Sequence, residues 1–202
     1  ILSTNNGVSW TAQTSPTATP LHSVAHDGVN TYVAVGDAGV VVTSTNGTDW
    51  TAGTAGVSAG LRSVRWDGAA FVVSGLGGTV LTSPSGATGT WTVRTTGVSD
   101  DLSDAAKLGS VYVAVGSAGT ITNSTDAAAW TKVSSGDTDH LRGVAALGAQ
   151  LIAVGNNGSI LTSTDALLGT TVAPALSWSV QTSPIALPLN AVAATSLMRV
   201  AV

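Results

Sequence analysis

The chain has 202 residues, 44% of them hydrophobic and only 9% charged, so it can bury a sizeable core beneath a mostly neutral surface. A net charge of -4, with seven basic residues spread along the length, argues against a nucleic-acid or anionic-membrane partner. The absence of cysteine excludes disulfides and thiolate metal sites, and because polar residues interrupt every apolar stretch we expect no transmembrane helix.

A repeat of about 40 residues runs through the chain. It is marked by five tryptophans, each followed 11 residues later by a leucine. The tryptophans are Trp10, Trp50, Trp91, Trp130 and Trp178, and the leucines are Leu21, Leu61, Leu102, Leu141 and Leu189. After each of the first four leucines comes a pair of glycines spaced three residues apart, at positions 36/39, 75/78, 116/119 and 155/158.

Each repeat predicts four short strands in chain order. The first opens with the leucine, the second is valine-rich (TYVAVG, VYVAVG), the third follows the glycine pair, and the fourth carries the tryptophan. Four strands in about 40 residues is the period of a β-propeller blade. We therefore expect blades at 21–50, 61–91, 102–130 and 141–178.

The two ends of the chain each match half a repeat. Residues 1–10 align with the last two strands of a blade, and residues 189–202 align with the first two, with Ile1 matching Val41 and Val202 matching Val35. We expect these segments to share a fifth blade, which would remove the open sheet edges and bring the termini together. The predicted fold is an all-β, five-bladed β-propeller of four antiparallel strands per blade, forming a single domain over 1–202.

The hairpin of the last two strands carries a motif, [ST]-x-[DN]-G-x-x-W. It is intact in TNNGVSW (4–10) and STNGTDW (44–50), and lacks the glycine in STDAAAW (124–130). This motif resembles the Asp-box or BNR-like repeat of sialidase-type propellers, photosystem II assembly-factor propellers and bacterial or phage surface proteins. The resemblance implies the propeller fold but no single function, because such proteins include hydrolases, lectins and assembly factors.

Other copies of the motif have drifted. Ser85 stands where the acid is expected, and nine extra residues precede Trp178. Such drift fits a role in turn formation and packing better than catalysis. We expect this structural role for the box residues Asn6, Asn46, Asp126 and Asp165 and for the repeat tryptophans.

The chain lacks the residues on which the resembling hydrolases depend. Sialidase-type enzymes use a Tyr–Glu pair and an arginine triad, and five-bladed glycosidases commonly use Glu as one partner. This chain contains no Glu, and Tyr32 and Tyr112 occupy equivalent repeat positions typical of core. We therefore predict no catalytic residue and no cofactor; a glycoside hydrolase that uses Asp alone is the least favoured alternative.

The residue after each repeat leucine is polar, and these five are called the mouth residues: His22, Arg62, Ser103, Arg142 and Asn190. In a propeller these positions surround one opening of the central channel, where loops on a rigid scaffold bind ligands. They are our predicted ligand-binding residues. The alternative is that strand starts near solvent are polar without binding anything.

Two further groups are candidates for contacts. Acidic residues cluster in two neighbouring loops, where carboxylates could bind a hard cation or simply form turns: Asp100, Asp101, Asp104, Asp137 and Asp139. The insertion within 166–176 is apolar and could contact a partner or fold back over its own blade: Leu167, Leu168, Val172 and Leu176. Trp66 lies outside the repeat pattern, and could stack on a sugar or pack on its own hairpin.

Two function classes follow. The favoured hypothesis is a non-catalytic, lectin-like recognition module that binds a glycan or another surface ligand, on a secreted, bacterial surface or phage virion protein. The alternative is a structural or assembly propeller that mediates protein–protein contacts with a neighbouring domain or subunit.

Overall fold

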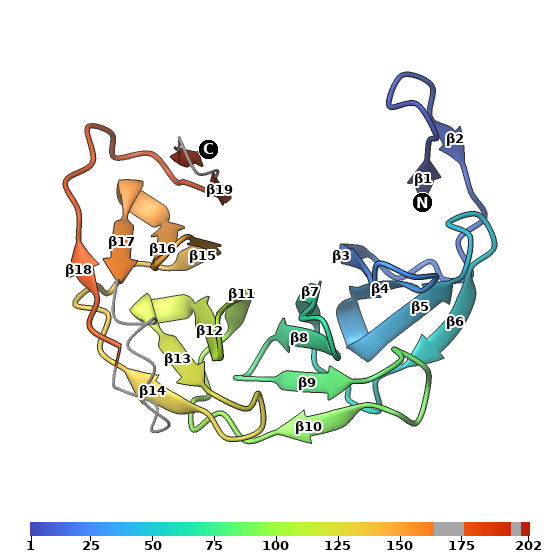
Figure 1. The fold of residues 1–202 in the computed structure, drawn as a ribbon, viewed down its shortest axis with the longest axis horizontal. Coiled ribbons are helices and arrows are strands. Elements are labelled where there is room, and N and C mark those ends of the chain that lie inside the picture. Colours follow the sequence, from blue (N-terminus) through green and yellow to red (C-terminus); the bar gives the residue numbers. More distant parts are fainter. Residues whose placement is uncertain (164–175, 195–198) are drawn as a thin grey trace.

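The computed structural model describes residues 1–163, 176–194 and 199–202, and Figure 1 shows them as an arc of small sheets. Four of the sheets have four antiparallel strands and follow one another along the chain. The first blade holds β3 (Leu21–His26), β4 (Tyr32–Gly36), β5 (Val40–Ser44) and β6 (Thr51–Thr54); the second holds β7 (Leu61–Trp66), β8 (Phe71–Gly75), β9 (Val80–Ser83) and β10 (Thr92–Arg94). The third holds β11 (Leu102–Leu108), β12 (Val111–Gly116), β13 (Ile121–Ser124) and β14 (Thr131–Val133); the fourth holds β15 (Leu141–Leu147), β16 (Gln150–Gly155), β17 (Ile160–Ser163) and β18 (Ser179–Val180).

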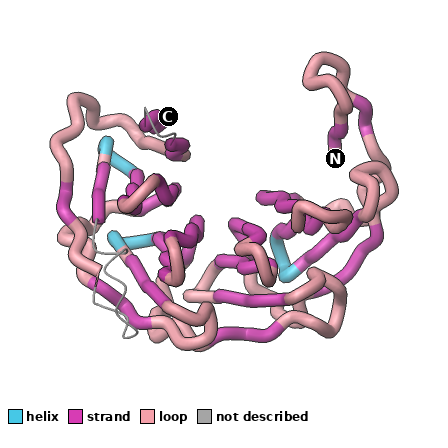
Figure 2. Tube along the Cα trace, viewed as in Figure 1, coloured by secondary structure: helices cyan, strands magenta, loops and turns pink. Residues whose placement is uncertain are grey.

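The predicted all-β, propeller-like arrangement of four-stranded antiparallel sheets is therefore confirmed. The inner strands β3, β7, β11 and β15 line the concave side of the arc (Figure 1). Three single turns of 3-10 helix, η1 (Asp37–Gly39), η2 (Ser117–Gly119) and η3 (Asn156–Gly158), join second to third strands, as the short cyan segments in Figure 2 show. No helix in the described part of the chain is long and apolar enough to cross a bilayer.

The two ends of the chain form separate two-stranded sheets. The N-terminal half-blade pairs β1 (Leu2–Ser3) with β2 (Thr11–Ala12), and the C-terminal half-blade pairs β19 (Val192–Ala194) with β20 (Arg199–Ala201). The predicted closure is not seen, because the two half-blades lie on opposite sides of an opening in the arc (Figure 1). Each half-blade packs beside its own neighbouring blade. The blade count of five therefore stays a prediction.

The core lies between blades. The second strand of each blade is buried on both faces, so its alternate residues contact different neighbours. Val33 and Val35 of β4 cluster with Phe71 and Val73 of the second blade, whereas Val72 of β8 joins the cluster shared with the third blade. Burial of both faces explains why these strands read as continuous apolar runs.

The paired glycines have a steric cause. A Cβ on Gly36 would lie only 2.0 Å from the backbone oxygen of Pro20, the residue before the repeat leucine. That oxygen accepts a hydrogen bond from the amide of Asp37 at 3.1 Å, so the glycine lets the turn approach the inner strand. Gly39 has a φ of +68°, in the left-handed region that favours glycine.

The box residues act within their own hairpins. The side-chain Oδ1 of Asn46 accepts hydrogen bonds from the amides of Thr48 and Asp49, both at 2.9 Å, and Asp126 makes the equivalent pair. The indoles of Trp50 and Trp130 each donate to a carbonyl of the same hairpin at 3.2 Å. This geometry is that of an Asx turn, as the structural interpretation of the motif required; Asp165 lies outside the described residues.

Candidate functional site at the channel mouth

Each mouth residue of the four complete blades sits in a β-bulge. In the pairing of β3 with β4, Leu21 lies opposite Gly36 and Ser23 opposite Val35. His22 is therefore an extra residue of β3 with no residue opposite it in β4. The same shift follows the leucine of β7, β11 and β15. A bulge re-aims the side chain of its extra residue, and the repeat therefore turns one side chain per blade toward the same end of the inner strands.

Asn190 continues this pattern in the C-terminal half-blade. Its amide and that of Ala191 both donate to the backbone oxygen of Val202, the second at 3.1 Å. Two amides of one strand therefore meet a single carbonyl of the other, as in a bulge. All five predicted mouth residues thus occupy equivalent places in the fold.

The first two mouth residues share one carboxylate. Asp37, in η1, accepts a hydrogen bond from Arg62 Nη1 at 2.6 Å and lies 3.0 Å from His22 Nε2. Arg62 belongs to the second blade, so this contact crosses a blade boundary. The hydrogen bond from Arg62, followed by that from His22, lowers the pKa of Asp37. Asp37 was missed by sequence reasoning, although it stands between the glycines of the repeat.

The next two mouth residues have different neighbours. Ser103 Oγ lies 2.8 Å from His140 Nε2, across the boundary between the third and fourth blades. Arg142 is exposed, and its Nε donates to Asn156 Oδ1 at 2.7 Å. Burial, and then the positive charge of Arg142, lower the pKa of His140. Among the described side chains, Arg94 and Arg142 are the arginines that form no ion pair with an acid.

The acidic residues of the neighbouring loops do not converge. Three of them have partners of their own: Asp100 accepts from Thr120 and Lys132, Asp101 from the Gly77 amide, and Asp104 from Ser63 and Arg65. Asp137 accepts from the amides of Thr138 and Asp139, and Asp139 accepts from Asn157 and Ser159. In the residues that the structure describes, no group of three or more acids and histidines could hold a metal ion. The arrangement fits turn formation and local pairing.

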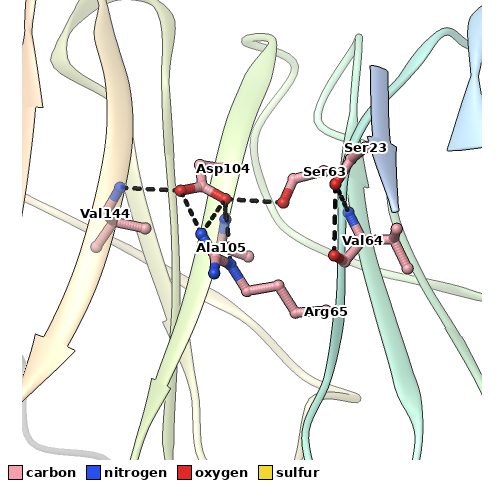
Figure 3. A network of polar contacts seen from close by, with 7 residues as sticks. All are labelled: Ser23, Ser63, Val64, Arg65, Asp104, Ala105 and Val144. Carbon is pink, nitrogen blue, oxygen red and sulfur yellow. Dashed lines mark hydrogen bonds and ion pairs between the residues drawn. The ribbon is translucent and has the colours of Figure 1, made fainter. Parts of the chain in front are cut away.

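The residues one position beyond the mouth residues lie at the boundaries between blades, and we call them the linking residues: Ser23, Ser63, Asp104, Gly143 and Ala191. The side chains of the first three make hydrogen bonds to a neighbouring blade. Figure 3 shows Asp104 between two strands, where Oδ1 accepts from Ser63 Oγ at 2.7 Å and Oδ2 accepts from the Val144 amide at 3.1 Å. Arg65 adds a hydrogen bond to Oδ2 at 2.8 Å. In the same way Ser23 Oγ accepts from the Val64 amide at 3.1 Å. This row holds the inner strands, and hence the mouth residues, in place.

A cleft of about 500 Å³ runs beside the other half of the inner strands, and the sequence had not indicated it. It is lined by small apolar residues of β11, β15 and β19 and by Arg65, Lys107 and Tyr112. The Tyr112 hydroxyl donates to Asp67 Oδ2 at 2.5 Å, so Tyr112 forms a link between blades as well as core. Burial, and then this bond, raise the pKa of Tyr112. Trp66 packs on Phe71 with ring centroids 4.8 Å apart, as the hairpin-packing alternative requires.

The apolar insertion is described only at its end. Leu176 is buried in the cluster of the third and fourth blades with Val133 and Leu161, so it packs over its own blade and is not free to contact a partner. Leu167, Leu168 and Val172 lie outside the described residues.

Comparisons with known proteins place this geometry among β-propellers. A family model described as the DUF6242 beta propeller domain matches residues 55–199. Among curated proteins no sequence match is found.

Solved structures share the fold at low identity. YCF48 from Cyanidioschyzon merolae is 17% identical with a TM-score of 0.62, over 89% of this chain and 62% of that one. A structure of YCF48 bound to D1 peptide is 14% identical with a TM-score of 0.61, over 84% of this chain and 56% of that one. A chain in a structure of the mitotic checkpoint complex is 16% identical with a TM-score of 0.62, over 86% of this chain and 55% of that one. The chain thus spans somewhat more than half the length of these structures, and the likeness shows the fold alone.

Proposed function

Starting from a chain that belongs to the DUF6242 beta propeller domain family, we propose that it is a non-catalytic protein-interaction module. Its ligand is a segment of another protein, bound at the mouth residues His22, Arg62, Ser103, Arg142 and Asn190. The observation that carries the proposal is the repeated bulge, which points five polar side chains toward the same end of the inner strands. A structural neighbour solved with a bound peptide supports a protein segment over a glycan as the ligand.

Arg142 is the anchor of this proposed site. It is exposed, its Nε is held by Asn156, and no acid neutralises it among the described residues. Burial and the charge of Arg142 itself lower the pKa of the neighbouring His140, against the opposing effect of Asp101, so the positive charge there at neutral pH is mainly that of the guanidinium. A guanidinium is a planar fork of donors that suits a carboxylate. The bound segment therefore carries Asp or Glu.

The test uses two labelled peptides of equal length, one of alternating Glu and Gly and one of alternating Gln and Gly, in a fluorescence anisotropy titration. We expect the acidic peptide to bind the native chain more tightly, with an affinity that falls as salt rises because the contact is exposed. The double substitution Arg62→Ala/Arg142→Ala should abolish the preference for the acidic peptide.

Arg94→Ala is the matched control. Arg94 Nε also donates to a neutral side-chain oxygen, Thr82 Oγ1 at 2.8 Å, but on the outer strand β10, far from the bulges in the strand order of its sheet. Its removal should leave binding unchanged. Equal loss in both variants, equal binding of the two peptides, or binding of a sialylated glycan array in place of the acidic peptide would each contradict the proposal.

A further inference from the structure

His140 lies beside Arg142 at the boundary between the third and fourth blades. One residue holds both of them, because the amide of Asn156 donates to the backbone oxygen of His140 at 2.9 Å while Asn156 Oδ1 accepts from Arg142 Nε at 2.7 Å. His140 is half-buried and directly precedes Leu141, the repeat leucine before the bulge. Both residues are therefore fixed to the same turn, η3, at the mouth.

The imidazole of His140 has a hydroxyl as its hydrogen-bond partner. Its Nε2 lies 2.8 Å from Ser103 Oγ. A hydroxyl can donate to the neutral ring and accept from the protonated ring, so this contact can be kept in both states. Among the described residues no hydrogen bond is made to Nδ1 of the ring, so the protonated ring has one N–H to offer to a ligand.

The other histidine of the mouth has a different partner. His22 Nε2 lies 3.0 Å from Asp37 Oδ1, and the same carboxylate binds Arg62. A positive charge on His22 is therefore met by an acid of the chain itself. His140 forms no ion pair with an acid in the part of the chain that the structure describes, so its charge is available to a bound segment.

Three charged groups adjoin His140. Burial, and then the positive charge of Arg142, lower its pKa, whereas the negative charge of Asp101 raises it. Asp139 precedes it in the chain, and the carboxylate of Asp139 is hydrogen-bonded by groups in and just after η3. Because its pKa lies below the usual value of about 6.5, the ring is mainly neutral at pH 7 and takes up its proton at lower pH.

We infer that His140 is a second cationic residue of the mouth site, and that in its protonated form it binds, together with Arg142, the carboxylate of one bound segment. The inference rests on the proposed function and adds a pH dependence to it. A carboxylate that accepts from the ring favours the protonated state and so raises the pKa of His140. By linkage, the affinity for an acidic segment rises as the pH falls below about 6.5, until the Glu side chains of the segment themselves become protonated near about pH 4.3.

The test is the ratio of the affinities for the labelled Glu-Gly peptide at about pH 5.5 and about pH 7.5, measured by fluorescence anisotropy. For the native chain we expect a ratio of about three to ten in favour of the lower pH. Each unit by which the bound carboxylate raises the pKa of His140 gives a tenfold gain in affinity. His140→Gln keeps a hydrogen-bonding side chain that does not titrate in this range, so it should lose most of this rise.

His26→Gln is the matched control. His26 is likewise half-buried, but it ends β3 (Leu21–His26), whereas the bulge lies at the start of that strand, and its Nδ1 accepts from the Gly28 amide at 3.1 Å. This variant should keep the ratio of the native chain. Equal ratios in the two variants, or a native chain that binds the peptide equally well at both pH values, would overturn this inference alone. A native chain that binds the peptide at neither pH would overturn it together with the proposed function.

A second measurement does not require His140→Gln to fold. The pKa of each histidine of the native chain is followed by NMR from its ring proton signals, with and without a saturating amount of the Glu-Gly peptide. We expect the peptide to raise the pKa of His140 by about 0.5–1 unit, in line with the affinity ratio, and to leave that of His26 unchanged. A pKa of His140 that is the same with and without bound peptide would overturn the inference.

Discussion

The mouth residues and the linking residues are adjacent in sequence, yet they serve different parts of the molecule. A mouth residue leaves the ladder at a bulge and pairs with loop groups near solvent, as Arg142 does with Asn156. The linking residue that follows faces sideways, and Asp104 thereby joins Ser63 to the Val144 amide. The extra residue of each bulge places its side chain near solvent, while the next residue makes the contacts between blades. One inserted residue per strand thus allows both roles at adjacent positions.

In the fourth blade the linking residue has no side chain, and the contact between blades is made in another way. Gly143 replaces the hydrogen-bonding residue in the fourth blade, and a Cβ there would lie 3.2 Å from the Cα of Ala191. The fourth blade and the C-terminal half-blade are therefore joined by close backbone approach and by the cluster around Leu189. Hydrogen bonds and close packing are alternative ways of making the same junction.

The largest effect is expected at the leucine that precedes both rows. Leu102 is fully buried, so Leu102→Ala should reduce the free energy of unfolding by about 2–5 kcal/mol through lost burial and the cavity left behind. Leu21→Ala should cost less, because Leu21 is only half-buried at the end of the arc. Urea unfolding at low protein concentration checks both, and an equal loss would show that the end of the arc is covered.

Asp104→Ala tests the linking role. It removes the acceptor of the Val144 amide and of Ser63, so we expect a loss of about 1–3 kcal/mol in unfolding free energy. Ser23→Ala, which removes one neutral hydrogen bond to the Val64 amide, should cost about 0.5–1.5 kcal/mol. If the two variants were equally stable, the carboxylate would not be the stronger link between blades.

Asp37→Asn tests the mouth side by its pH dependence. The pKa of Asp37 is lowered in the folded chain, chiefly by Arg62, so its ionised form stabilises the fold at neutral pH. That contribution is present above the unfolded carboxyl pKa and is lost as pH falls through the lower folded value. The stability difference between the native chain and Asp37→Asn should therefore shrink as the pH falls below about 4, the usual pKa of a carboxyl group. A difference independent of pH would contradict the pairing with Arg62.

The smallest effect concerns the turns beside the mouth. Ala38 has a φ of 54°, whereas the second blade has Gly77 at the equivalent position. Relief of the left-handed strain, offset by the greater backbone freedom of glycine, should make Ala38→Gly neutral to stabilising by up to about 1 kcal/mol. Gly77→Ala should be destabilising by a similar amount in the same thermal melts; opposite signs would show that the turns differ in conformation.

Sequence periodicity was sufficient for the sheets but not for the site. The spacing of Leu61, Gly75 and Trp91 predicts the strands, because alternation and turn residues are local properties. The bulge at Arg62 was not foreseen, since the same spacing fits a flat or a bulged strand. The contact of Arg62 with Asp37 was also missed, because it joins loops of different blades.

The predicted closure of the ring is not seen, for a related reason. Alignment of Ile1 with Val41 and of Val202 with Val35 shows that the half-blades are complementary in sequence. Complementarity does not say whether the arc curves enough to bring them together, since that depends on the packing angle at every blade interface. The structure leaves them apart (Figure 2).

The most direct test of the separate roles of mouth and linking residues uses the same preparations of Arg142→Ala and Asp104→Ala for two measurements. One is the unfolding free energy of each variant, and the other is the fluorescence anisotropy of the labelled Glu-Gly peptide as it binds. Arg142→Ala should lose binding of the peptide, while its unfolding free energy stays within about 0.5 kcal/mol of that of the native chain, as for other surface substitutions. Asp104→Ala should lose stability and keep the peptide in its folded fraction. Two results would contradict the separate roles of mouth and linking residues. One is peptide binding that survives Arg142→Ala, and the other is a loss of stability in Arg142→Ala equal to that in Asp104→Ala.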